Sequence, residues 1–140
     1  MGKGRGAVTV TTINPQGLKQ PDNFAQVRIG TGTKLVVLAG QVGYAQDTFE
    51  MPDGYRAQMR QTILNVAHSL KAGGAQLDDL LRLTVYVVDL NESNKPEVWA
   101  GYLEGLKESG LPAAAMAMMG ISSLAGPEYL VEVEAMAIAD

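Results

Sequence analysis

The chain contains no cysteine, one histidine and one tryptophan among its 140 residues. Without cysteine it can form no disulfide, thiolate zinc site or iron–sulfur site, and it has no cysteine nucleophile. A single histidine, His68, excludes a metal site built from several histidines, and any Ser-His-Asp triad would have to use it. We therefore predict no metal site and no cofactor.

Positive charge and long apolar runs are also scarce. Eleven Lys and Arg residues against fifteen Asp and Glu give a net charge of −4, which argues against a nucleic-acid partner. No apolar run approaches the ~20 residues that cross a bilayer, so we expect no membrane partner and a cytoplasmic location. Residues 1–6 are Gly-rich without an apolar core, which predicts a flexible tail on one domain spanning residues 1–140.

The patterning predicts an α+β protein with the element order β-β-β-α-β-α-β-β. Strands are expected over residues 7–13, 24–29, 34–39, 81–88, 113–121 and 130–138. One helix is expected over residues 55–72, and a second is capped by Asn94 and ended by Gly110. Both helices cross over between strands, so they should lie together on one face of a mixed sheet, with 81–88 as a central strand.

Apolar spacing predicts which side of each element is buried. The first helix should bury Met59, Ile63, Val66, Ala67 and Leu70, and the second Val98, Tyr102, Leu103 and Leu106. The nearly continuous apolar run over residues 34–39 predicts a strand buried on both faces, after a turn at residues 30–32.

Few side chains are candidates for chemistry. His68 lies off the apolar face of its helix and is interpreted as solvated. Packing in a core or an interface is the favoured interpretation of the cluster Met116, Met118 and Met119, with an adaptable pocket wall as the alternative. Glu132 and Glu134 share one side of a strand whose other side is apolar; they are either a solvated face, which spacing alone favours, or functional carboxylates.

Several segments, taken together and in order, resemble the YjgF/RidA family of small trimeric proteins, also catalogued as endoribonuclease L-PSP. They comprise residues 39–41, 57–66, 74–80, 84–90 and 130–135. The resemblance extends from about residue 14 to residue 139. It implies a chorismate-mutase-like α+β fold, assembled as a homotrimer with a shallow small-molecule cleft at each subunit interface.

The same resemblance implies a set of site residues. In the family's active deaminases, an arginine after a Pro-Ala pair holds the carboxylate of an imine or enamine acid, and a glutamate positions the water that hydrolyses the C=N bond. That glutamate corresponds to Glu132, which we predict to be catalytic. The predicted substrate-binding residues are Phe24, Ala39, Gly40, Trp99, Met116 and Met118.

The family's arginine is missing from this chain. Counting forward from Pro112 puts Ala114 at the position of the arginine, and counting back from Leu124 and Glu132 puts Met116 there. No arginine follows Arg82 in the sequence. Neither side chain can replace a guanidinium–carboxylate fork. Arg28 is the residue that could supply a guanidinium from elsewhere in the fold.

These features leave three functions open. The first is a RidA-like hydrolase or deaminase that acts on an imine or enamine compound at the inter-subunit cleft, other than the usual 2-imino acids. The alternative is a non-catalytic ligand-binding or interaction trimer. An endoribonuclease is the weakest, because the net charge is −4, no basic stripe is present and there is one histidine.

Overall fold

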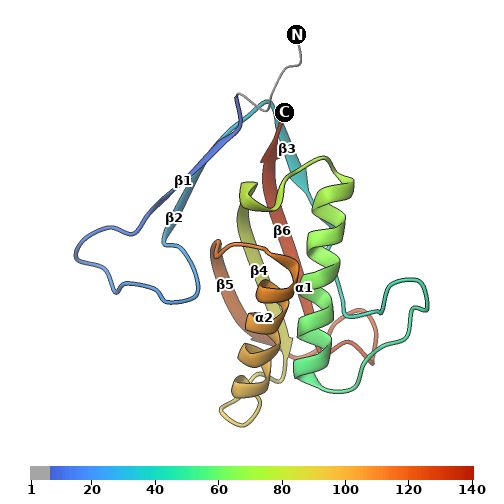
Figure 1. The fold of residues 1–140 in the computed structure, drawn as a ribbon. Helices are drawn as coiled ribbons and strands as arrows, with labels where there is room; N and C mark the ends of the chain where they lie inside the picture. Colours follow the sequence, from blue (N-terminus) through green and yellow to red (C-terminus); the bar gives the residue numbers. More distant parts are fainter. Residues whose placement is uncertain (1–6) are drawn as a thin grey trace.

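The computed structural model describes residues 7–140, and the predicted tail over residues 1–6 lies outside them. The predicted order of strands and helices is confirmed, with one additional 3-10 helix, η1 (Figure 1). The elements are β1 (Thr9–Ile13), β2 (Val27–Thr31), β3 (Lys34–Val37), α1 (Tyr55–Ala72), η1 (Leu77–Asp79), β4 (Leu80–Val88), α2 (Lys95–Ser109), β5 (Ala115–Ile121) and β6 (Val131–Ala139).

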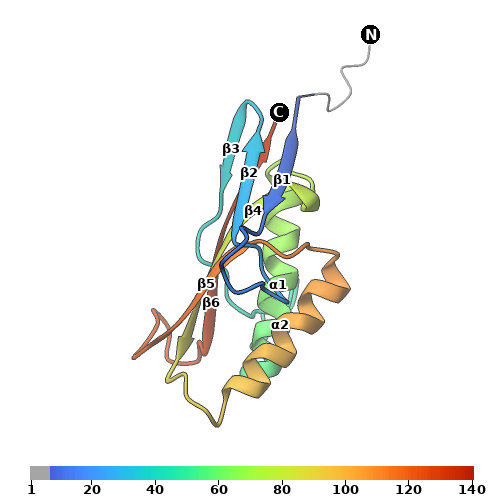
Figure 2. The same cartoon turned by 90° about the vertical axis from the view of Figure 1, so that its left-hand side faces the viewer.

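Four strands form a mixed sheet in the order β3-β6-β4-β5, so β4 is an interior strand as predicted. The β3–β6 and β6–β4 pairs are antiparallel, and β4–β5 is parallel. Both helices lie on the same side of this sheet (Figure 2). The sheet therefore has one face covered by helices, the covered face, and an opposite face, the open face.

The remaining two strands do not join this sheet. β1 and β2 pair only with each other, as a two-stranded antiparallel ribbon that leaves the body of the molecule (Figure 1). The chain turns at Gly32 and Thr33, one or two residues later than expected, and β3 then pairs with β6 instead of β2. Most ribbon residues are exposed, so the ribbon has no apolar face buried against the sheet.

The first helix packs as its spacing predicts, and the second differs. All five predicted α1 residues are buried. On α2, Val98 and Tyr102 are buried, but Leu103 is 42% exposed, which corrects the prediction. The buried positions beside Val98 and Tyr102 are glycines instead. A Cβ on Gly101 would lie 2.3 Å from the Arg56 carbonyl oxygen, so α2 approaches α1 too closely for a leucine there.

The ends of α2 show one correct and one incorrect expectation. Gly110 ends the helix with a left-handed φ of 82°, which is readily available to glycine. Asn94 precedes the helix, but its side chain makes no capping hydrogen bond. Its Oδ1 instead accepts from the backbone N–H of Asn91 at 2.9 Å, which stabilises the preceding turn.

The open face exposes apolar side chains. β6 alternates as predicted, with Val131, Val133, Ala135 and Ala137 on the covered face. The prediction that the third strand is buried on both faces is wrong for the single chain, because Leu35 is 63% and Val37 is 58% exposed. Nothing within residues 7–140 of one chain covers that side of β3. No helix in the described part of the chain is both long and apolar enough to span a membrane.

Candidate functional site

Glu132 lies on the open face near the start of β6, opposite Tyr86 of β4. The segment after β3 continues along the other side of β6, where the N–H of Gln41 donates to the Val133 carbonyl at 2.8 Å and the reverse bond measures 2.9 Å. This pairing brings Gly40 against the Glu132 side chain. A Cβ on Gly40 would lie 2.6 Å from Cδ and 2.8 Å from Oε2 of Glu132, so the carboxylate occupies space that any other residue at 40 would fill.

The two glutamates of β6 have different surroundings. Burial, and then the nearby charge of Glu134, raise the pKa of Glu132 above its ordinary value. Glu134 is exposed and accepts a hydrogen bond from the Tyr86 hydroxyl, which raises the pKa of Tyr86. Within residues 7–140 no group donates a hydrogen bond to the Glu132 carboxylate. Glu132 is thus the half-buried carboxylate that is free to take a proton or orient a water.

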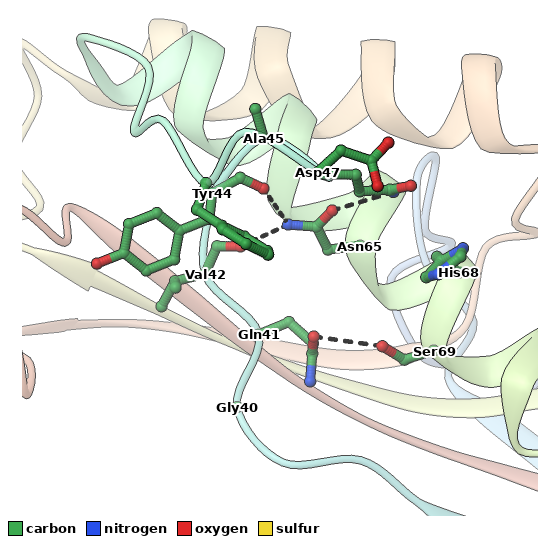
Figure 3. A pocket seen from close by; sticks show the side chains of 11 residues that line it. Gly40, Gln41, Val42, Tyr44, Ala45, Asp47, Asn65, His68 and Ser69 are labelled. Atoms are coloured by element: carbon green, nitrogen blue, oxygen red, sulfur yellow. Dashed lines mark hydrogen bonds between the residues drawn. The ribbon is translucent and has the colours of Figure 1, made fainter.

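A hollow of about 530 Å³ lies on the other side of Gly40, between the loop that follows β3 and α1 (Figure 3). Asn65 of α1 donates to the carbonyls of Val42 and Tyr44, both at 2.8 Å, and Ser69 donates to Gln41 Oε1 at 3.3 Å. These bonds fix the loop, and with it the position of Gly40. Sequence reasoning did not single out Asn65 or Ser69; their polarity beside the apolar stripe of α1 was the available signal.

His68 also lines this hollow (Figure 3). Its side chain is exposed at the surface of α1, as expected for a solvated histidine. No group of three or more metal-ligating side chains occurs among residues 7–140. The Ser69 hydroxyl donates to Gln41, and no hydrogen bond joins it to His68 within residues 7–140, so the hollow shows no paired nucleophile and base.

Phe24 and Trp99 lie together in a second hollow, of about 270 Å³. Phe24 is placed by its neighbour Ala25, whose N–H donates to the Ala114 carbonyl at 3.0 Å, just before β5. Trp99 projects from α2 and packs edge-to-face on the buried Tyr102, with ring centroids 5.5 Å apart. The two predicted aromatic residues are thus neighbours across the loop and the helix.

The remaining predicted residues divide between these places. Ala39 and Gly40 lie beside β6 near Glu132. Met116 and Met118 face Leu83 and Val85 in the parallel β4–β5 register, which puts them on the covered face. They are partly buried against the core, in agreement with the packing interpretation.

In one chain, Glu132 and Phe24 are well separated. Glu132 pairs with Tyr86 of β4. Ala115 of β5 pairs with Arg82, which is four positions away from Tyr86 along β4. Ala25, the neighbour of Phe24, lies beside Ala115. Four residues along a strand separate the two places by roughly 13 Å in the strand direction, and the three strand spacings from β6 to the segment at Ala25 add roughly 14 Å across the sheet. The site residues predicted from the resemblance therefore form two groups, one around Glu132 and one around Phe24.

Neither Arg28 nor Arg82, the two arginines that could hold a substrate carboxylate, lies close to Glu132. The Arg28 guanidinium donates to the carbonyls of Leu80 (2.8 Å) and Asp78 (3.0 Å) and to the Thr12 hydroxyl (2.9 Å), so it fastens the ribbon to the start of β4. Burial lowers the pKa of Arg28. Arg82 is on the open face, but four positions along β4 from the residue opposite Glu132, roughly 13 Å away.

Comparison with known proteins agrees with the resemblance seen in the sequence. The family profile described as Endoribonuclease L-PSP matches residues 18–139. A 2-iminobutanoate/2-iminopropanoate deaminase from Escherichia coli K12 is 34% identical over 58 residues, which cover 41% of this chain and 45% of that protein, so the match spans less than half of the curated relative.

Two further relatives are matched over more of their length. A RutC family protein from Pyrococcus horikoshii is 33% identical over 105 residues, covering 74% of this chain and 78% of that one. The crystal structure of YyfB from Yersinia pestis, a Rid-family protein of unknown function, matches with a TM-score of 0.78 and 29% identity, over 92% of this chain and 98% of that one. These matches confirm the predicted family and the α+β arrangement of helices and mixed sheet.

Proposed function

Because the chain belongs to the endoribonuclease L-PSP family, also called YjgF/RidA, we propose that it is a RidA-like hydrolase that deaminates a small imine or enamine. The observation that carries this proposal is the half-buried Glu132 carboxylate lying against Gly40, with its pKa raised by burial. A carboxylate whose pKa is raised toward neutrality is suited to accept a proton from water.

The proposed reaction is hydrolysis of a C=N bond. The oxygen of water adds to the imine carbon while Glu132 takes one proton from the water. The carboxyl passes this proton to the nitrogen, which has received the second electron pair of the C=N bond, and a neutral tetrahedral amino alcohol results. Glu132 then takes the hydroxyl proton and delivers it to the nitrogen as the C–N bond breaks, so the carbonyl forms and ammonia leaves with the bonding electron pair. Water is the only co-reactant, so the reaction requires no metal and no redox cofactor.

The substrate we propose lacks the α-carboxylate of the usual 2-imino acids. No arginine follows Arg82 in the sequence, and the donors of Arg28 are engaged with Leu80, Asp78 and Thr12. A substrate carboxylate at Glu132 would therefore meet a like charge without a guanidinium to compensate it.

We also propose that the functional assembly is a homotrimer formed through the open face. Leu35, Val37, Met119 and Met136 are exposed on this face, with exposed fractions of 38% to 63%. Association would remove this apolar surface from water. It would also allow the Glu132 group of one copy to meet the Phe24 group of another, forming a cleft with the small-molecule ligand between subunits.

The test compares hydrolysis of two kinds of imine generated in the assay by an oxidase. An amine oxidase supplies imines without a carboxylate, and an amino-acid oxidase supplies 2-iminopropanoate and 2-iminobutanoate. We expect ammonia release from the first kind to exceed the spontaneous rate, and release from the second to stay near background. Turnover of the 2-imino acids that is lost in Arg28→Ala would contradict the substrate assignment.

Variants on β6 test the role of Glu132. Glu132→Gln should lower the rate by about 10²–10⁴-fold, the usual contribution of a general acid–base group. Glu134→Gln removes the same charge two residues away and should retain most of the activity. If Glu132→Gln keeps the full rate, Glu132 is not the catalytic group. If none of the imines is turned over, the alternative of a non-catalytic ligand-binding trimer, which the missing arginine favours, replaces the hydrolase.

A further inference from the structure

We infer that the hollow between Phe24 and Trp99 binds the planar aromatic group of the substrate, so that the substrate class is an uncharged aryl-substituted imine. This inference rests on the proposed function and narrows it. The hollow is lined by Trp99 of α2 and by residues of the loop over residues 14–26. The end of this loop lies beside β5, the outer strand of the sheet (Figure 1). At about 270 Å³ it is slightly smaller than the usual pocket for a drug-sized ligand, which suits a compound with a single ring.

The walls of the hollow are fixed by hydrogen bonds within the loop. The N–H of Gln26 donates to Asn14 Oδ1 at 2.9 Å, and Gln26 Nε2 donates to the Lys19 carbonyl at 3.0 Å. Gln20 Nε2 donates to the carbonyls of Pro15 and Leu18 at 3.1 and 3.0 Å. A ligand would meet a loop that is already ordered, so little conformational entropy would be lost on binding.

The same bonds leave the hollow with an aromatic character. The amide N–H₂ groups of Gln20 and Gln26 are directed at carbonyls of their own loop. The ring of Trp99 is held on one side by its edge-to-face contact with Tyr102, and both Trp99 and Phe24 remain partly exposed to the hollow. Two fixed, partly exposed aromatic rings can contact an entering ring face to edge, which a saturated ring cannot reproduce.

The charges at the rim favour a neutral group. Lys19 and Asp22 both line the hollow, with opposite signs that leave no net charge. Within residues 7–140, the side chains of Lys19 and Asp22 form no hydrogen bond and no ion pair. A rim with one charge of each sign differs from an arginine guanidinium, which would select a substrate carboxylate.

The single tryptophan makes the test direct, because the tryptophan fluorescence of the chain comes from Trp99 and excitation at the long-wavelength edge of its absorption avoids the five tyrosines. The full-length protein is titrated with 2-phenylacetamide, a stable neutral compound, and with 2-cyclohexylacetamide, its saturated counterpart. We expect a saturable change in emission and about five-fold tighter binding of the phenyl compound, within the range measured for aromatic pairs. Equal affinities, or no saturable change, would overturn the inference.

The two phenylalanines of the chain provide a matched pair of variants. Phe24→Leu should abolish the preference for the phenyl compound, whereas Phe49→Leu, at a 72% exposed ring lining the other hollow, should leave it unchanged. An unchanged preference in a folded Phe24→Leu variant would also overturn the inference. If that variant does not fold, the comparison of the two compounds on the unchanged chain still decides.

Binding and turnover separate this inference from the proposed function. Glu132→Gln should keep the preference for the phenyl over the cyclohexyl compound, because that preference originates at the rings of Phe24 and Trp99. Turnover of aliphatic imines without any preference for the phenyl compound would reject the aromatic site alone. A phenyl preference without turnover of any imine would reject the hydrolase and leave an aromatic binding site.

Discussion

The two faces of the four-stranded sheet are made by alternate residues of the same strands, yet they differ in almost every property. On the covered face, Leu83, Val85 and Val133 have no exposed surface. On the open face, their neighbours Tyr86, Glu132 and Glu134 are polar, and Met136 is 43% exposed. Because successive side chains of a strand point to opposite faces, one face can be selected for stability while the other is selected for chemistry and association.

The largest effect on stability is expected on the covered face. Leu83→Ala removes a fully buried side chain between the helices and the sheet and leaves a cavity. The free energy of unfolding should fall by about 2–5 kcal/mol, measured by urea denaturation. A loss of under 1 kcal/mol would mean that the two faces differ less in their contribution to stability than their burial indicates.

Charged substitutions on the open face should change the stability of the single chain little and its assembly into trimers strongly. Replacing both Leu35 and Val37 by Lys puts charges at side chains that are already exposed in one chain. The helical circular dichroism signal should persist, while light scattering after size exclusion should change from three subunits to one at micromolar concentration. Leu103→Lys, at an exposed leucine of α2, is the control and should remain trimeric. A double variant that remains trimeric would show that assembly uses another surface.

The smallest effect is expected from the charge of Glu132 itself. Its folded-state pKa is raised, so the folded chain binds more protons than the unfolded chain between the two pKa values. Its contribution to stability is therefore most favourable at low pH and declines as pH rises through the folded pKa. Glu132→Gln should raise Tm by about 1–3 °C at pH 8 and by almost nothing at pH 4.

The control for that measurement is Glu50→Gln, which removes the same charge from an exposed loop position. Thermal melts of both variants and the unchanged chain are compared at the two pH values. A larger gain for Glu132→Gln at pH 4 than at pH 8 would contradict the direction of the pKa shift.

Features that depend on local periodicity could be predicted from the sequence. The bounds of α1 match the prediction, because its apolar side chains repeat at helical spacing between a glycine at each end. The alternation of β6 correctly separated Val133 from Glu132. Features that depend on distant packing could not. Nothing in the spacing of α2 showed that Gly101, and not Leu103, would face α1.

The candidate site shows the same limit. The resemblance supplied Glu132, Gly40 and Phe24 as members of one site, and the structure brings only the first two together in one chain. Pairing of β6 with the segment after β3 explains why, since it is a contact between residues about ninety positions apart that no local pattern encodes. The separate β1–β2 ribbon could not be predicted either, because strand propensity does not reveal which strands will pair.

The contact between Gly40 and Glu132 has a consequence for how these positions can change together. The atoms that a Cβ at residue 40 would meet belong to the far end of a flexible side chain, so Gly40→Ala displaces the carboxylate at little cost to the fold. A shorter residue at 132 would lack the Cγ, Cδ and Oε2 atoms that crowd this Cβ, so the two substitutions are energetically coupled and their effects are not additive. A lineage that lost the glutamate would be released from the glycine as well. Among relatives, residues corresponding to 40 and 132 should therefore covary, with larger side chains at the first position appearing only where the second has no carboxylate.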